Sequence, residues 1–404
     1  MNYKMIAVII MTLTWLYGMV LELLERRSAD NPIPDNVADV YDPETYKKWR
    51  AYHAEKSRLG FISQTASFVI SLILILSNAY PAFAKLFPDT DLVQMLSVFL
   101  LSTLSDLLLL PVSWIDTMVI EEKYGFNRTD KKTFWLDALK EMVISFVIMA
   151  VIGSLLMVIH KALGDWMIVV FTAVMTLLML GFSFLSPVLT KIFNKFTPLE
   201  DGELKEKLTA LLEKHGYKVR AIQVMDASRR STKSNAYFTG FGKMKTIVLY
   251  DNLVAQMTTD EICAVFAHEM GHGLHKDTLK NQIFSALQMF MMAVLAWLTL
   301  RTPEIFASFG FERINYGFAF ILIGLEFALF SPLFSLLVSA HSRKAEYRAD
   351  RQAVKEGYGT ALISGLKKLT RENFGDLSPD PLLVKLTYSH PTLSQRISAI
   401  GLTE

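Results

Sequence analysis

The residues best suited to metal chemistry in this chain are His268, Glu269 and His272, which follow the pattern His-Glu-x-x-His. On an α-helix, residues four apart lie on one face, so the two imidazoles would point to the same place and could hold one Zn²⁺ ion. Glu269 lies beside them, where its carboxylate could act as general base on a water that the metal activates. The segment is expected to be helical, because Thr258 and Glu261 form a capping-box pattern ahead of it.

A catalytic zinc site usually has three protein ligands and an open position for water, so the motif requires a third ligand. Glu346 and Asp350 lie four residues apart in a second expected helix. We expect Glu346 to be the third ligand and Asp350 to accept a hydrogen bond from a ligand histidine, which would orient that ring. Each pattern alone could be a chance pair on a structural or solvated helix, but together they favour a catalytic zinc site. His275 could mimic a ligand, but Glu346 fits the pattern better.

The composition is typical of a membrane protein. The chain has 404 residues, 52% of them hydrophobic, and its mean hydropathy is +0.32, which is too apolar for an ordinary soluble enzyme. The formal net charge of +2 gives no indication of a nucleic-acid partner. Cys263 is the single cysteine, which excludes a disulfide framework and suits a catalytic part in a reducing compartment.

Seven stretches have about the 20 apolar residues needed to cross a bilayer. They cover residues 3–24, 61–83, 92–112, 136–159, 166–189, 283–300 and 316–340. We therefore expect a mainly α-helical, polytopic membrane protein in which residues 1–190 hold the first five spans and residues 282–340 the last two. Asp106 and Glu326 fall within spans, so their side chains are expected to face the interior or a polar partner rather than lipid.

The distribution of positive charge predicts the orientation of these spans. One side holds only five scattered basic residues, namely Lys4, Lys85, Lys161, Arg301 and Arg313. The first and third connections, on the other side, are rich in Lys and Arg, with Arg26, Arg27, Lys47, Lys48, Arg50, Lys56 and Arg58 in the first and Lys123, Arg128, Lys131 and Lys132 in the third. Because cytoplasmic connections are enriched in these residues, the zinc motif is expected to face the cytoplasm, under either a bacterial inner membrane or an endoplasmic reticulum membrane.

Two polar parts of the chain remain, an insertion at residues 191–281 and a helical tail at residues 341–404. Within the insertion we expect a helix at 203–215, strands at 222–225 and 246–250, and between them a strand followed by a turn at 234–242. The helix of the zinc motif comes next, and Glu346 is supplied by the tail. The metal site is therefore expected to lie in a small α+β zincin-like domain. Its third ligand comes from the tail, which follows the last two spans in the sequence.

The sequence resembles the type I CAAX prenyl protease family, whose members are integral-membrane zinc metalloproteases, over nearly its whole length. Five segments in matching order carry the resemblance: Val-Ile-Glu-Glu-Lys-Tyr-Gly-Phe-Asn at 119–127, Asn235-Ala236-Tyr237, the zinc motif, Glu346 with Asp350, and Ser-His-Pro-Thr at 389–392 with Arg396 beyond it. The resemblance implies seven tilted helices that enclose a large water-filled chamber, with the zinc site at its cytoplasmic end.

The resemblance also implies how substrate would be bound. His390, which alone would be an ordinary surface histidine, would contact the oxyanion or substrate carbonyls. Asn235 and Ala236 would hold an extended peptide by strand addition. Arg396 would either bind a substrate carboxylate or form a structural ion pair.

The function expected from these residues is zinc-dependent hydrolysis of a peptide bond, with Glu269 as general base. The resemblance adds the substrate class, prenylated CAAX-type proteins or peptides cleaved near their C-terminus, and the expected surroundings of the protein are a lipid bilayer. An intramembrane protease of the site-2 type would carry its motif inside a span, whereas here charged residues flank the motif. A quality-control metalloprotease would have fewer spans. A transporter or scaffold with a relict zinc site is disfavoured by the intact Glu269.

Overall fold

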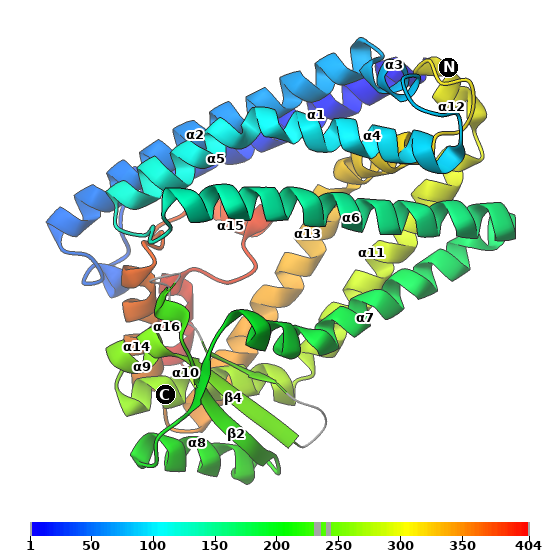
Figure 1. The fold of residues 1–404 in the computed structure, drawn as a ribbon. Coiled ribbons are helices and arrows are strands. Elements are labelled where there is room, and N and C mark those ends of the chain that lie inside the picture. Colours follow the sequence, from blue (N-terminus) through cyan, green and yellow to red (C-terminus); the bar gives the residue numbers. More distant parts are fainter. Residues whose placement is uncertain (1, 230–235, 240–243, 403–404) are drawn as a thin grey trace.

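The computed structural model describes residues 2–229, 236–239 and 244–402. Figure 1 shows long helices that make up most of the molecule and a smaller part, at one end, that contains the β-sheet. The two parts are joined by α13 (Tyr316–Lys355), a helix of 40 residues and therefore about 60 Å long. Since a bilayer core is about 30 Å thick, α13 can cross it and still extend far into the smaller part.

The long helices follow the apolar stretches of the sequence. They are α1 (Tyr3–Ser28), α2 (Pro43–Leu76), α4 (Asp91–Asp106), α6 (Lys131–Leu163), α7 (Met167–Phe193), α11 (Asp277–Leu300) and α13. Five of them begin at a residue whose side chain accepts a hydrogen bond from the first turn, namely Asn2, Asp42, Thr90, Asp130 and Asn315.

Six helical stretches of the described chain are long and apolar enough to cross a membrane. Five contain one long helix each, whereas the fourth, Lys131–Ser183, has 53 residues and contains α6, the short turn η4 (Gly164–Trp166) and most of α7. The chain reverses at η4, where Gly164 has a φ of 52°. As a result α6 and α7 form a helical hairpin and contact each other (Figure 1).

Two of the predicted spans differ from the observed helices. The span expected at 61–83 is interrupted, because α2 ends at Leu76 and the left-handed Asn78 starts the separate short helix α3 (Ala79–Ala84). The span expected at 92–112 is interrupted at η2 (Leu107–Leu109) and continues as α5 (Leu110–Ile115) and η3 (Asp116–Glu121), which has π-helical geometry. Pro111 explains the break, since it lacks the N–H that a continuous helix needs.

The two acidic residues predicted to avoid lipid do have polar or open surroundings. Glu326 accepts hydrogen bonds from Thr299 Oγ1, at 3.0 Å to each carboxylate oxygen, between α13 and α11. Asp106 lines a cavity of about 720 Å³ between the broken third span and α6. Irregular backbone and a carboxylate at this depth are expected where helices face a cavity rather than hydrocarbon.

The smaller part is built on a four-stranded sheet with the order β1-β2-β4-β3. Its strands are β1 (Phe196–Pro198), β2 (Lys218–Met225), β3 (Ala236–Thr239) and β4 (Met244–Tyr250); β2 and β4 are parallel and the outer pairs are antiparallel. The helices of this part are α8 (Glu203–Lys214), η5 (Ala227–Arg229), α9 (Asp251–Gln256) and α10 (Thr259–Leu274). The helix and three strands expected here are present, β1 was not predicted, and the expected turn at 240–242 lies outside the described residues.

The C-terminal helices close the molecule against the connection between α1 and α2. They are α14 (Gly359–Glu372), α15 (Pro381–Thr387) and α16 (Leu393–Gly401); on the opposite side α12 (Pro303–Ser308) connects α11 to α13. The connection contains η1 (Asp35–Val37), and Tyr41 donates its hydroxyl to the Thr370 and Gly375 carbonyls, at 3.0 and 2.9 Å. Residues more than 300 positions apart therefore share one core beside the metal motif.

Candidate metal centre

The helix α10 presents the His-Glu-x-x-His motif from a buried position. It begins with the predicted capping box, in which Thr258 accepts from the Glu261 amide and Glu261 accepts from the Thr258 amide. Inside the motif, Gly271 lies directly against α13, and a Cβ at this position would come within 2.8 Å of the Ala349 Cα. Because glycine permits this close approach, α13 can place Glu346 and Asp350 next to the histidines.

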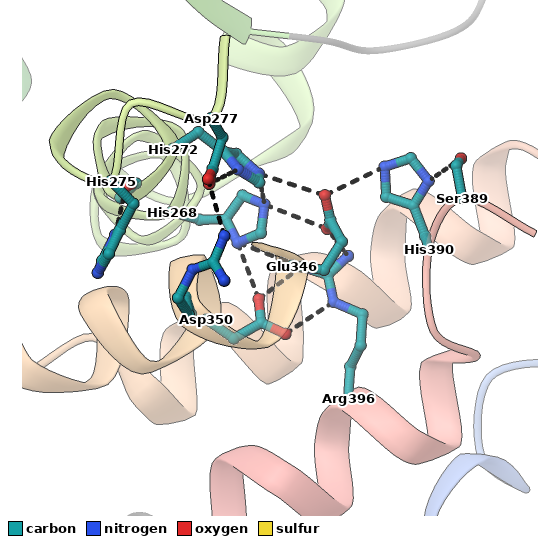
Figure 2. Close-up of polar contacts among 11 residues, drawn as sticks. His268, His272, His275, Asp277, Glu346, Asp350, Ser389, His390 and Arg396 are labelled. Atoms are coloured by element: carbon teal, nitrogen blue, oxygen red, sulfur yellow. Dashed lines mark hydrogen bonds and ion pairs between the residues drawn. The ribbon is translucent and has the colours of Figure 1, made fainter. Parts of the chain in front are cut away.

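His268, His272 and Glu346 form a cluster that could hold one metal ion (Figure 2). One ligand atom from each lies within 4.8 Å of the others. The two Nε2 atoms are 3.2 Å apart, Glu346 Oε1 is 3.2 Å from His272 Nε2, and Glu346 Oε2 is 3.4 Å from His268 Nε2. The predicted ligand set is thus brought together by α10 and α13.

The chemistry of these groups fits a metal cation. Glu346 Oε2 is buried, and its cationic neighbours in the described part of the chain, His268 Nε2 and Arg396 Nη1, lie 3.4 and 3.6 Å away, which leaves a lone pair available to a metal ion. Both histidines direct Nδ1 toward a carboxylate, so in the neutral rings each Nε2 carries a lone pair directed into the cluster. Two imidazole nitrogens and one carboxylate oxygen are the ligands of many catalytic zinc sites.

Asp350 orients His268, as the sequence predicts. His268 Nδ1 donates to Asp350 Oδ1 at 2.8 Å, and both side chains are buried. Arg396 from α16 donates two hydrogen bonds to the same carboxylate, from Nε at 2.9 Å and from Nη2 at 2.6 Å. This is the structural ion pair that the sequence left open for Arg396, whereas its contact with a substrate carboxylate stays a prediction.

His272 has a corresponding partner, Asp277, that the sequence analysis missed. His272 Nδ1 donates to Asp277 Oδ2 at 3.2 Å, and Asp277 Oδ1 accepts from Arg348 Nη2 at 2.8 Å and Lys280 Nζ at 3.1 Å. Asp277 is the first residue of α11 and reaches back to α10 because Lys276, between the two helices, has a left-handed φ of 55°. In the sequence, only the position of Asp277 five residues after His272 could have indicated this contact.

The surroundings shift the pKa values of the residues on α10. Burial disfavours the charged form of His268, but hydrogen bonds to Asp350 and Glu346 outweigh it and raise its pKa to about 9. Burial likewise opposes, and Glu346 supports, the charge on His272, whose pKa is raised. These shifts show that the cluster attracts positive charge. The pKa of Glu269 is raised too, mainly by burial, while the two neighbouring histidines oppose the shift.

His390 lies on the open side of the cluster (Figure 2). Its Nε2 is 3.4 Å from Glu346 Oε1, although 61% of its side chain is exposed. Ser389 Oγ is 2.8 Å from its Nδ1, a contact that was not predicted. By contrast, His275 is turned away from the cluster, and its Nδ1 donates to the Gly271 carbonyl at 2.7 Å.

The predicted peptide-binding strand corresponds to β3. Ala236 is buried and pairs with Leu249 of β4 at the edge of the sheet. Asn235, the other residue predicted to contact substrate, lies outside the described residues. Since β3 also packs against α10, its position is compatible with strand addition beside the metal cluster.

Two family descriptions together match almost the entire chain. Residues 22–195 match "CAAX prenyl protease N-terminal, five membrane helices", and residues 198–403 match "Peptidase family M48". The second match contains all three candidate ligands.

Individual relatives agree with these matches. The chain is 33% identical to CAAX prenyl protease 1 of Saccharomyces cerevisiae, over 93% of this chain and 90% of that protein. It is 31% identical to the CAAX prenyl protease 1 homolog of Homo sapiens, over 91% and 88%. The crystal structure of S. mikatae Ste24p resembles it with a TM-score of 0.91 and 30% identity, covering 98% of this chain and 99% of that one.

Proposed function

Because the chain belongs to peptidase family M48, with the N-terminal membrane domain of the CAAX prenyl proteases, we propose that it hydrolyses peptide bonds near the C-terminus of prenylated, CAAX-type proteins as a zinc metalloprotease. The observation that carries this proposal is the cluster of His268, His272 and Glu346, of which His268 and Glu346 are buried and His272 is partly buried, with Glu269 adjacent to His268 in the sequence. A metallopeptidase needs three ligands and a general base at this spacing.

The metal is zinc in this proposal, and the residues that hold it are His268, His272 and Glu346. When bound, zinc would supply Lewis-acid chemistry, activating water and polarising a carbonyl. Asp350 and Asp277 hold the two imidazole rings in the tautomer that directs Nε2 toward the ion. Arg396, Arg348 and Lys280 neutralise these two carboxylates.

Glu269 is the general base in this proposal. It takes a proton from the attacking water and delivers it to the leaving amine, which requires a pKa closer to neutrality than that of an exposed glutamate. The burial that raises its pKa supports this role.

His390 stabilises the negative charge that develops on the scissile carbonyl oxygen. Its exposed ring borders the cluster at 3.4 Å from Glu346 Oε1, so a peptide lying over the cluster would come within reach of Nε2. The edge strand β3, which begins at Ala236, would hold the peptide backbone in an extended form, and Asn235, the preceding residue in the sequence, is proposed to bind substrate with it. Arg396 is also proposed to bind a carboxylate group of the substrate, in addition to its ion pair with Asp350.

The membrane part is proposed to contain seven spans that enclose a chamber, with the metal domain on the cytoplasmic side. The support for seven is that α6 and α7, 33 and 27 residues long, are each long enough to cross a bilayer and are separated by the reversal at Gly164. The support for the orientation is the concentration of Lys and Arg in the first and third connections. The proposed units are residues 1–190, 191–281, 282–340 and 341–404.

Cleavage of a quenched CAAX peptide by the detergent-purified protein tests the substrate class. We expect cleavage of the farnesylated peptide, and weaker cleavage of the same peptide without the lipid. Equal cleavage of both would contradict the preference for prenylated substrates while leaving a peptidase. Cleavage that continues unchanged after the metal is removed by a chelator would contradict the metalloprotease itself.

A further inference from the structure

The segment that carries His390 lies between two short helices, α15 and α16. His390 itself is mostly exposed, and the one hydrogen bond that its ring forms within the described chain is to the adjacent Ser389. Its other polar contact in the described chain is that of Nε2 with Glu346 Oε1, at 3.4 Å. Because most of the side chain is exposed, the location of the ring depends on how the backbone of residues 388–392 is fixed.

The side chain of Arg343 binds the C-terminal end of α15. Its Nη1 donates to the Tyr388 carbonyl at 2.6 Å and the Val384 carbonyl at 3.1 Å, and its Nη2 donates to the Lys385 carbonyl at 3.3 Å. The last carbonyls of a helix lack intrahelical partners and carry partial negative charge, so a guanidinium is well suited to bind them. Tyr388 is the second residue before His390.

Arg343 lies three residues before the ligand Glu346 on the same helix, α13. Residues three apart are neighbours on one face of a helix. On the other side of Glu346, Asp350 binds Arg396 of α16. The helix α13 thus contacts the chain both just before and just after the segment at 388–392, and Glu346 lies between these two contacts.

We infer that Arg343 is a positioning residue for the peptidase reaction: by binding the last carbonyls of α15, it places His390 beside the metal cluster. This inference rests on the proposed role of His390 in stabilising the transition state. Within the described part of the chain, the hydrogen bonds of Arg343 go to the carbonyls of Val384, Lys385 and Tyr388 and none goes to a candidate ligand. Its effect on turnover therefore passes through the backbone at Tyr388.

The fold does not depend on Arg343 alone to hold α15. The N-terminal end of this helix is fixed separately, because the Asp380 amide donates to Ser28 Oγ at 2.8 Å and Leu383 and Val384 are buried. Arg343→Gln should therefore leave α15 in place and loosen only its C-terminal end, together with the segment that follows.

The test is a double-mutant cycle on cleavage of a farnesylated CAAX peptide by the full-length protein. We expect Arg343→Gln to lower kcat about 10- to 100-fold, the loss expected when a catalytic group is displaced by about an ångström, with zinc content unchanged. In the His390→Ala background, the same substitution should change kcat by less than about threefold, because the group that it positions is already gone. Arg351→Gln, on an exposed part of the same helix, should leave kcat unchanged.

Two kinds of result distinguish a failure of the inference about Arg343 from a failure of the proposed function. Losses that multiply in the double variant, or loss of zinc from Arg343→Gln, would show that Arg343 has a general structural role and would overturn the inference. If Arg343→Gln does not fold, Arg343→Lys takes its place in the cycle, since a lysine keeps the charge but cannot bind three carbonyls. Absence of cleavage by the unmodified protein would instead contradict the proposed function.

Discussion

At the scale of single residues, the metal cluster combines groups that sequence spacing reveals with groups that it does not. His268 and His272 were predicted because two positions four apart on a helix share a face, and Glu346 was predicted because a catalytic zinc site needs a third ligand. Asp277 was missed because its contact with His272 depends on the left-handed turn at Lys276, a backbone conformation that the sequence does not specify. The ion pair of Arg396 with Asp350 could likewise not be predicted from the sequence, because it depends on how α16 packs on α13.

Asp277 provides a prediction at this scale. In Asp277→Asn, the His272 ring loses its charged acceptor, and zinc affinity should fall about 10- to 100-fold, as for other carboxylates that orient ligand histidines. Competition with a chromogenic chelator measures the affinity directly. His275→Ala, which alters a histidine outside the cluster, should keep the affinity of the unmodified protein; unchanged affinity in Asp277→Asn would rule out the orienting role.

The raised pKa of His268 predicts how pH acts on the metal-free protein. Its pKa is about 9 in the folded state and about 6.5 when unfolded, so its contacts with Asp350 and Glu346 stabilise the fold fully below pH 6.5. This stabilisation is lost as the pH rises through 9. The Tm measured in chelator should therefore fall over this range, and the fall should be smaller in Asp350→Asn.

Zinc binding should show the opposite trend, because the metal must displace the proton from His268. Apparent affinity is expected to rise by about tenfold per pH unit between pH 6.5 and 8.5 if one proton is released. A pH-independent affinity over this range would contradict the assignment of His268 as a protonated ligand in the metal-free state.

At the scale of secondary-structure elements, hydropathy located the membrane helices but not their interruptions. The apolar runs predicted α1, α4, α6, α7, α11 and α13, whereas the breaks after Leu76 and at Leu107–Leu109 depend on local backbone geometry. In the smaller part of the molecule, three of the four strands were predicted from the sequence and β1 was not. The parallel pairing of β2 with β4 joins segments that are separated by β3 and could not be predicted.

The close contact between α10 and α13 gives a prediction at this scale. Gly271→Ala adds a Cβ that would lie 2.8 Å from the Ala349 Cα, so the two helices must separate at a cost of about 1–3 kcal/mol. We expect a lower Tm and weaker zinc binding, since two ligands are on α10 and one is on α13. Gly324→Ala, at a position on α13 with no neighbouring atom within 4 Å, should change neither; equal effects in both variants would contradict the packing argument.

At the scale of the whole molecule, one long helix relates the membrane to the metal centre. The helix α13 carries Glu326 in its apolar part and Glu346 in the smaller part that contains the sheet, so a single helix links these two positions. The similarity to Ste24p, with a TM-score of 0.91, extends over both parts. The composition of the chain indicated neither the breaks in the spans nor the extension of α13 beyond its apolar part as one helix.

The orientation across the membrane can be tested with the chain's single cysteine, Cys263, which is buried. In a Cys263→Ala background, Glu206→Cys in the metal domain and Glu304→Cys on α12 provide exposed reporters in the two regions that the proposal places on opposite sides. In sealed membrane vesicles whose outer surface is the non-cytoplasmic face, a membrane-impermeant maleimide should label the Glu304 position only, because cytoplasmic segments are the Lys- and Arg-rich ones. Labelling of the Glu206 position alone would reverse the proposed topology.

The central claim is that this chain cleaves peptides with a zinc ion held by His268, His272 and Glu346 and with Glu269 as general base. The most direct measurement pairs zinc content with turnover of a farnesylated CAAX peptide, for the unmodified protein and for Glu269→Gln. We expect one zinc ion per chain in both proteins and a turnover at least about 100-fold lower in Glu269→Gln. Near-normal turnover by Glu269→Gln with its zinc in place would contradict it.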